Sequence, residues 1–130
     1  MKFIEVDLSV AIKENKIIAH LVFSNNTSEK VLLDKFIICY NNRIRNNYFK
    51  IFDKSNNRID YIGPLVKRYI TDEDFIYINP GEKIETFIDL NEVYKIKAGK
   101  KYTIQYSAYF PTESDDPGII KVESNLVEGA

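Results

Sequence analysis

Apolar and polar residues alternate along two stretches of this chain. In residues 4–13 every even position is isoleucine, valine or leucine, and charged or small residues stand between them. In residues 101–110 the alternating apolar positions are Tyr102, Ile104, Tyr106, Ala108 and Phe110. Side chains on a strand point alternately to its two faces, so this period of two predicts strands that each have one buried face.

The next stretch, residues 17–24, is more continuously apolar and follows a polar turn at residues 14–16. It predicts an antiparallel hairpin with the first strand. The continuous pattern further predicts a central strand, or one that is covered on both faces.

Shorter apolar runs predict the remaining strands. They lie at residues 48–52, 59–62, 75–78, 84–90 and 119–127, and the first two would form a second hairpin around the polar loop 53–58. In the last run we expect Ile120, Val122 and Leu126 on one side. The runs at 31–33 and 36–40 fit either a bulged strand or a strand followed by an irregular crossover.

Together these patterns predict an all-β fold. Eight or nine short strands separated by turn signals, with no long helical period, favour an immunoglobulin-like antiparallel β-sandwich of about eight strands. A closed β-barrel is the alternative. The chain of 130 residues is long enough to bury a core, and we expect one domain over residues 1–130.

Composition agrees with this fold and narrows the classes of partner. Aromatic residues make up 13%, from nine tyrosines and eight phenylalanines, and these residues suit a half-buried sheet. A net charge of −1 gives no general attraction to nucleic acid or membranes, and no apolar run is long enough to predict a membrane span. The first ten residues do not resemble a signal peptide, which predicts a cytoplasmic protein unless a leader has been removed.

The residues that usually carry catalysis are scarce. Cys39 is the single cysteine and lies in an apolar run, so we expect a buried thiol rather than a nucleophile. His20 is the single histidine and falls within a predicted strand. The carboxylate clusters at residues 72–74 and 115–116 lack the spacing of an EF-hand loop. We therefore predict a protein that is not an enzyme, with no catalytic residues, no metal site and no cofactor.

Basic residues are concentrated in the middle of the chain. Residues 42–69 contain seven lysines and arginines against two aspartates, whereas residues 111–130 contain five acidic residues against one lysine. Ordinary charged loops would explain this, and so would a surface that steers a protein partner. For the second case we predict partner-binding loops at 41–47 and 65–74, with rim charges and one aromatic anchor from Arg43, Arg45, Lys67, Arg68 and Tyr69. RNA binding by Arg43, Arg45, Tyr48 and Tyr69 is disfavoured by the net charge.

Tyr102 stands at the predicted start of a late strand. In immunoglobulin-like sandwiches a tyrosine at this place bonds back across a corner. We therefore expect a structural clamp rather than a binding role for Tyr102.

Several segments resemble a known family. These are the Asn-Thr-Ser turn after the second strand, FKIFDKSNNRIDYIGPLVKR, TDEDFIYINPGEKI and DLNEVYKIKAGKKYTIQY. Over about four fifths of the chain their order resembles the N-terminal β-domain of deuterolysin-like, peptidyl-lysine zinc metallopeptidases. The zinc-binding HExxH of that family lies in a later domain and has no counterpart here, so no catalytic residue carries over.

The resemblance implies an immunoglobulin-like sandwich that docks on a protease as a pro-segment, chaperone or inhibitor. A free-standing chain of this kind would be an inhibitor or immunity protein, and its partner another protein, such as a protease or a toxin. Two further hypotheses remain open: a carbohydrate- or calcium-binding accessory module that uses tyrosines or Asp72 and Asp74, and a structural subunit that associates through strand edges.

Overall fold

The computed structural model describes residues 4–67, 71–111 and 119–129. In these ranges the chain forms nine strands, two short 3-10 turns and a single-turn helix, α1 (Leu90–Val93). The strands are β1 (Glu5–Lys13), β2 (Lys16–Ser24), β3 (Val31–Asp34), β4 (Phe49–Asp53), β5 (Phe75–Ile78), β6 (Lys83–Asp89), β7 (Tyr102–Pro111), β8 (Ile119–Glu123) and β9 (Val127–Gly129). The protein is therefore all-β, as predicted.

The strands pair antiparallel into three open sheets. The first has the order β1-β2-β6, so β2 is its central strand, as its continuous apolar pattern predicted. The second is the pair β3-β5. In the third, β7 pairs with β4 along one edge, and with β9 and then β8 along the other.

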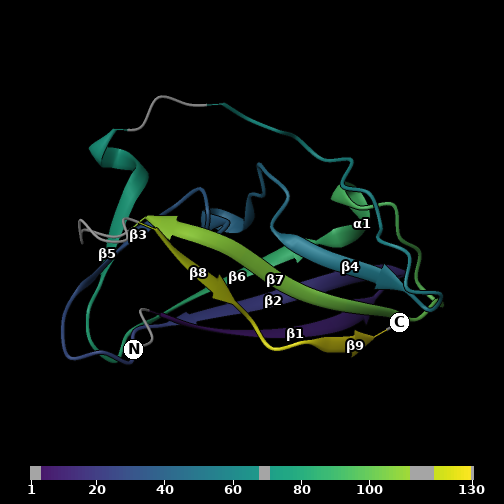
Figure 1. Ribbon diagram of the computed structural model, residues 1–130, viewed down its shortest axis with the longest axis horizontal. Helices are drawn as coiled ribbons and strands as arrows, with labels where there is room; N and C mark the ends of the chain where they lie inside the picture. Colours follow the sequence, from purple (N-terminus) through teal and green to yellow (C-terminus); the bar gives the residue numbers. More distant parts are fainter. Residues whose placement is uncertain (1–3, 68–70, 112–118, 130) are drawn as a thin grey trace.

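The β4-β7-β8-β9 sheet lies over the β1-β2-β6 sheet, and the two form the layers of a sandwich (Figure 1). The alternating side chains meet between the layers: Leu21 and Phe23 of β2 and Ile104 and Tyr106 of β7 are fully buried. The rings of Phe23 and Tyr106 pack edge to face, with their centroids 5.4 Å apart. Burial of these apolar and aromatic side chains is the main source of stability.

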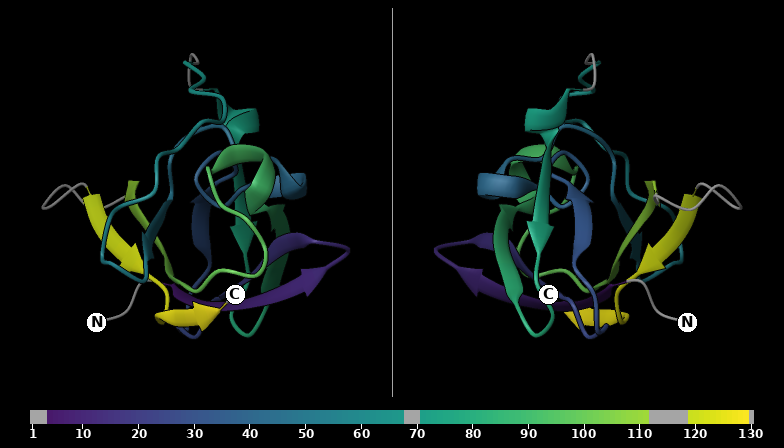
Figure 2. Two further views of the ribbon diagram at one scale, coloured as in Figure 1. Left: turned by 90° about the vertical axis from the view of Figure 1, so that its right-hand side faces the viewer. Right: turned by 90° about the vertical axis from the view of Figure 1, so that its left-hand side faces the viewer.

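The tip of the β1–β2 hairpin projects beyond the two layers (Figure 2). Glu14 and Asn15 both have positive φ, 52° and 65°, as a tight two-residue hairpin turn requires. Residues 11–16 are exposed, and Ile12 is 47% exposed although it belongs to the apolar period of its strand. The alternation of apolar and polar residues therefore predicted the strand correctly, but it did not show that the end of the strand lies outside the core.

Two predictions for irregular segments are resolved or corrected by the structure. Residues 36–40 form the irregular crossover that was one of the two alternatives: Asp34 Oδ1 accepts the N–H of Phe36 at 2.9 Å, and Cys39 has a φ of 55°. The prediction of a strand at 59–62 is wrong. After one bridge between Phe52 and Arg58, this segment leaves β4 and bridges Tyr61 to Tyr94.

The last predicted strand is interrupted at residues 124–126, between β8 and β9. Val122 is buried as expected, but Leu126 is 64% exposed, because it belongs to the interruption and no longer follows the alternation of the strand. The prediction that placed Leu126 beside Val122 is therefore wrong.

Candidate functional site

Residues 65–67, the start of one predicted binding loop, lie on a connection that crosses one side of the sandwich, whereas the other predicted loop, residues 41–47, precedes β4. The connection begins after β4, and Ile62 N–H donates to Val93 C=O of α1 at 2.8 Å. The Tyr61 hydroxyl donates to the carbonyl of Pro64. The ring of Tyr61 packs on the ring of Tyr94, with the two centroids 5.2 Å apart. These contacts fix the backbone of residues 61–64 against the core.

Gly63 is required where the connection passes α1. A Cβ at this position would lie 2.6 Å from Val93 Cγ1 and 2.8 Å from Val93 Cβ, closer than real Cβ atoms approach. Gly63 is therefore a point of close packing between the connection and α1.

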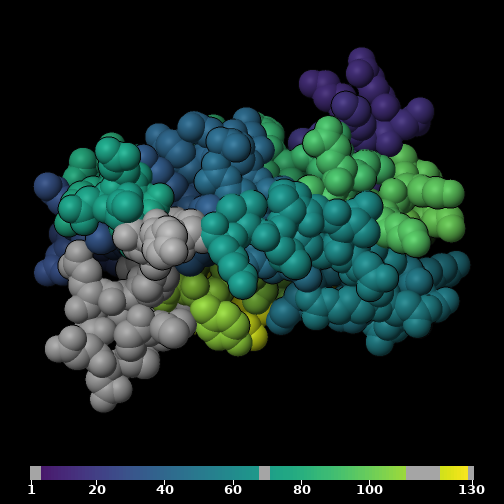
Figure 3. Space-filling model, turned by 90° about the horizontal axis from the view of Figure 1, so that it is seen from above, coloured from purple at the N-terminus to yellow at the C-terminus, as the bar shows by residue number. Residues whose placement is uncertain are grey.

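The structure brings the two predicted loops together. Val66 N–H donates to Arg45 C=O at 3.0 Å, so residues 65–67 run beside residues 43–47. Figure 3 shows this teal connection lying against the blue segment of the chain. Arg43 and Lys67 are exposed, and the guanidinium of Arg45 lies 5.1 Å from the centre of the Phe36 ring. Three of the five predicted site residues therefore lie on two adjoining segments.

The other two predicted site residues, Arg68 and Tyr69, lie outside the described residues. So do Asp115 and Asp116 of the second acidic cluster. In the first cluster, Asp74 Oδ2 accepts the N–H of Thr71 at 2.7 Å and caps the short turn Asp72–Asp74. Within the ranges described, no three histidine, cysteine, aspartate or glutamate side chains gather closely enough to hold a metal ion.

Exposed apolar side chains on the connection were missed by the sequence reasoning. Ile62, Leu65 and Val66 are 58%, 71% and 42% exposed. Leu65 and Val66 follow Gly63-Pro64 and have no alternating partners, which was the available signal that they lie outside the core. Together with the basic residues of the two segments, these apolar side chains form what we call the loop surface, made of the side chains of Arg43, Arg45, Ile62, Leu65, Val66 and Lys67.

A buried tyrosine holds the end of the first loop in place. Tyr94 is 1% exposed, and its hydroxyl accepts the N–H of Phe49 at 3.0 Å and donates to Asn47 Oδ1. Burial raises the pKa of Tyr94 far above its usual value, so the hydroxyl keeps its proton. The last residues of the loop are thereby fixed where β4 begins.

Tyr102 acts as the predicted clamp. It is 5% exposed at the start of β7, and its hydroxyl accepts the N–H of Lys97 at 3.1 Å. The bond spans five residues back across the corner, and Tyr102 is therefore a structural residue.

The cysteine and the histidine lie on separate parts of the molecule. Cys39 is fully buried in the crossover, as predicted, and burial raises the pKa of its thiol to about 12, which makes it a poor nucleophile. His20 lies on the outer face of β2, where its ring stacks on Phe87 at 4.4 Å and Nε2 lies 3.2 Å from Glu85 Oε1. The two side chains thus form no nucleophile–base pair.

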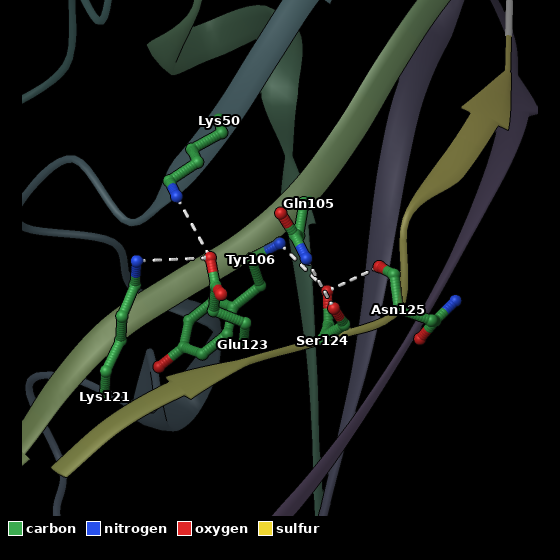
Figure 4. Close-up of polar contacts among 7 residues, drawn as sticks. All are labelled: Lys50, Gln105, Tyr106, Lys121, Glu123, Ser124 and Asn125. Carbon is green, nitrogen blue, oxygen red and sulfur yellow. Dashed lines mark hydrogen bonds and ion pairs between the residues drawn. The ribbon is translucent and has the colours of Figure 1, made fainter.

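The outer face of the β4-β7-β8 sheet carries a polar network (Figure 4). Glu123 Oε2 lies 3.0 Å from Lys50 Nζ and 3.7 Å from Lys121 Nζ. The hydrogen bond from Lys50 is the largest cause of a lowered pKa at Glu123. Beside this network, Gln105 Nε2 donates to Ser124 C=O, and Ser124 Oγ accepts the N–H of Tyr106.

Comparison with known protein families finds no family model that matches the chain, and no curated protein matches it. The resemblance to the deuterolysin-like β-domain stays a prediction. None of the helices in the described ranges is long and apolar enough to cross a membrane.

Proposed function

We propose that this protein is a non-catalytic domain that binds another protein through the loop surface. The observation that carries the proposal is the hydrogen bond of 3.0 Å between Val66 and Arg45, which joins two irregular segments into one surface. Residues 62–67 supply the exposed apolar side chains and Lys67, and residues 43–45 add the two arginines beside them.

The composition of this surface supports a protein partner. Its centre is apolar and highly exposed, with Leu65 at 71% and Ile62 at 58%. Arginine and lysine stand beside this apolar strip on both segments. Stable interfaces commonly combine an apolar centre with a polar rim, and a few central side chains carry most of the binding free energy.

The way the segments are held also supports binding. Residues 61–64 are fixed by Val93, Tyr94 and the close packing at Gly63. A surface that is already ordered loses less conformational entropy when a partner docks, so more of the contact energy appears as affinity.

We propose a protease as the first partner class to test, because the family resemblance points to a domain that docks on zinc metallopeptidases. The experiment measures inhibition of a panel of lysine-specific and other zinc metallopeptidases by the purified protein, with direct binding measured in parallel. Absence of both inhibition and binding at micromolar protein would count against the inhibitor form.

The loop surface is tested by a matched pair of leucine variants. Leu65→Ala is expected to weaken partner binding about tenfold, because a central apolar contact is lost. Leu126→Ala removes a similarly exposed leucine, 64% exposed, far along the chain at the β8–β9 junction, and should leave affinity unchanged. Equal loss in both variants would contradict the assignment of the surface.

The basic residues are tested separately through kinetics. Arg43→Ala combined with Lys67→Ala is expected to slow association several-fold and to reduce its dependence on salt, because exposed rim charges act mainly on the encounter rate. An unchanged association rate at low salt would show that the partner approaches by another face.

A further inference from the structure

One edge of β7 is paired along only half its length. Ser107 N–H donates to Tyr48 C=O on the β4 side, whereas Tyr106 C=O accepts the N–H of Ser124 on the β8 side. Because backbone groups alternate in direction along a strand, the odd residues of β7 face β4 and the even residues face β8. The N–H and C=O of Tyr109 therefore point to the β4 side.

At this point β4 no longer supplies a partner. The register that pairs Phe49 with Tyr106 would place Asn46 opposite Tyr109, but the strand begins at Phe49 and the chain turns away at Asn46 and Asn47. Among the residues described, none makes a backbone hydrogen bond to Tyr109 from this side. Within the described residues, Tyr109 thus offers an unused backbone N–H and C=O in line with β4.

A hollow of about 340 Å³ lies at this open edge. Asn46, Tyr48 and Lys50 line it from the β4 side, Ser107 and Tyr109 from β7, and Arg58 also contributes. Tyr109 is 62% exposed, and its ring lies beside the ammonium of Lys121 at 5.9 Å.

The charge around the hollow is positive. Lys50 and Arg58 line it, and no carboxylate is among the described lining residues. Lys50 and Lys121 share the single carboxylate of Glu123, and the guanidinium of Arg58 lies over the ring of Phe52. A peptide that carries acidic side chains would complement this arrangement.

We infer that this edge binds a short extended peptide segment of a partner protein, which pairs with Tyr109 antiparallel to β7 and continues the line of β4. Added strands of this kind gain affinity from backbone hydrogen bonds and specificity from alternate side chains. Alternate side chains of the peptide would enter the hollow, and acidic ones would be favoured there. The inference goes beyond the proposed function, because the edge uses none of the side chains of the loop surface and either site can fail alone.

The test selects from a displayed library of random octapeptides on the wild-type protein. The recovered peptides are then measured against Tyr109→Pro, which removes the edge N–H, and Tyr109→Ala, which keeps the N–H and removes the side chain. Proline is tolerated at edge positions whose N–H is unpaired, and thermal unfolding checks that both variants fold.

Enriched peptides are expected to alternate in polarity and to contain more acidic than basic residues. The proline variant should weaken their binding about fivefold or more, and more than the alanine variant does, since a backbone hydrogen bond is lost. Arg58→Gln should weaken acidic peptides several-fold, whereas Lys83→Gln, an exposed lysine on β6, should not.

Failure to enrich any peptide, or equal retention by the wild type and the proline variant, overturns the inference. If the proline variant does not fold, amide hydrogen exchange of the wild-type protein decides. A bound peptide must slow exchange at Tyr109, and unchanged exchange at that amide overturns the inference in the same way.

Discussion

Three buried tyrosines join irregular segments to the sandwich by their hydroxyl groups. Tyr102 binds Lys97, Tyr94 binds Phe49 and Asn47, and Tyr106 donates to the carbonyl of Ile37 at 2.7 Å. Each ring adds apolar burial to the core while its hydroxyl satisfies a backbone or side-chain group of a loop. Tyrosine, rather than phenylalanine, is therefore the residue these three positions need.

Tyr102→Phe tests this at the predicted clamp. The variant keeps the buried ring but leaves Lys97 N–H without its partner, so the free energy of unfolding should fall by about 1 kcal/mol. Urea unfolding measures the change. Tyr109→Phe, which alters a 62% exposed tyrosine, should change it by less than about 0.5 kcal/mol. A Tyr102→Phe variant no less stable than this control would mean that the Tyr102 bond contributes nothing.

Among the elements, the interruption between β8 and β9 links the two sheets. The carboxamide of Asn125 accepts the N–H of Leu8 at 2.8 Å and donates to the C=O of Leu8 at 3.0 Å. The carboxamide of Asn125 thus makes the two hydrogen bonds that a neighbouring strand would make with Leu8 at the edge of β1. A residue of the interruption between β8 and β9 therefore covers the edge of β1.

Asn125→Ala should therefore cost about 1–3 kcal/mol of unfolding free energy, because both backbone groups of Leu8 lose their partner. Amide exchange at Leu8 should become faster in the same variant. The neighbouring variant Leu126→Ala changes an exposed side chain and serves as the control. Unchanged exchange at Leu8 would contradict the bridging role.

The connection that carries the loop surface depends on Gly63. Gly63→Ala places a methyl group 2.6 Å from Val93 Cγ1, which should cost about 1–3 kcal/mol and shift residues 61–67. Adding Val93→Ala should recover part of the loss, as a double-mutant cycle would measure. A fully additive cycle would rule out this contact as the cause.

The pattern of apolar and polar residues predicted two kinds of strand: those that pair with a strand close in sequence, and those in which the alternation continues over many residues. β1, β2 and β7 are strands of these kinds, and the central place of β2 was also predicted. Residues 59–62 were misread because their apolar pattern fits either β4 or the segment around Tyr94, and only the folded chain selects between them. For the candidate site, the loops were predicted, but their contact at Val66 and Arg45 depends on that same long-range choice.

For the molecule as a whole, burial of weakly acidic side chains links stability to alkaline pH. Burial is the main cause of a raised pKa at Cys39 and Tyr61, both to about 12, and at Tyr94 and Tyr106. In the unfolded chain these groups ionise near their usual values of 9.0 and 10.0. Above those values the unfolded state binds fewer protons than the native state, and stability must fall as the pH rises.

The free energy of unfolding should thus receive the full contribution of these groups below about pH 9, and lose it progressively as the pH rises towards about 12. Urea unfolding at a series of pH values measures this. In the same series, a thiol reagent should modify Cys39 only at the rate at which the protein opens. Rapid modification of the native protein near neutral pH would show that Cys39 is not protected.

The central position of β2 also constrains how the chain is made. β2 ends at Ser24, but β6, which covers its second edge, ends at Asp89, so about two thirds of the chain must leave the ribosome before that edge is closed. Until then the most apolar strand of the protein has one free edge and no opposing layer, a state that invites aggregation or chaperone binding. The sandwich is therefore completed late in synthesis, although its first hairpin forms early.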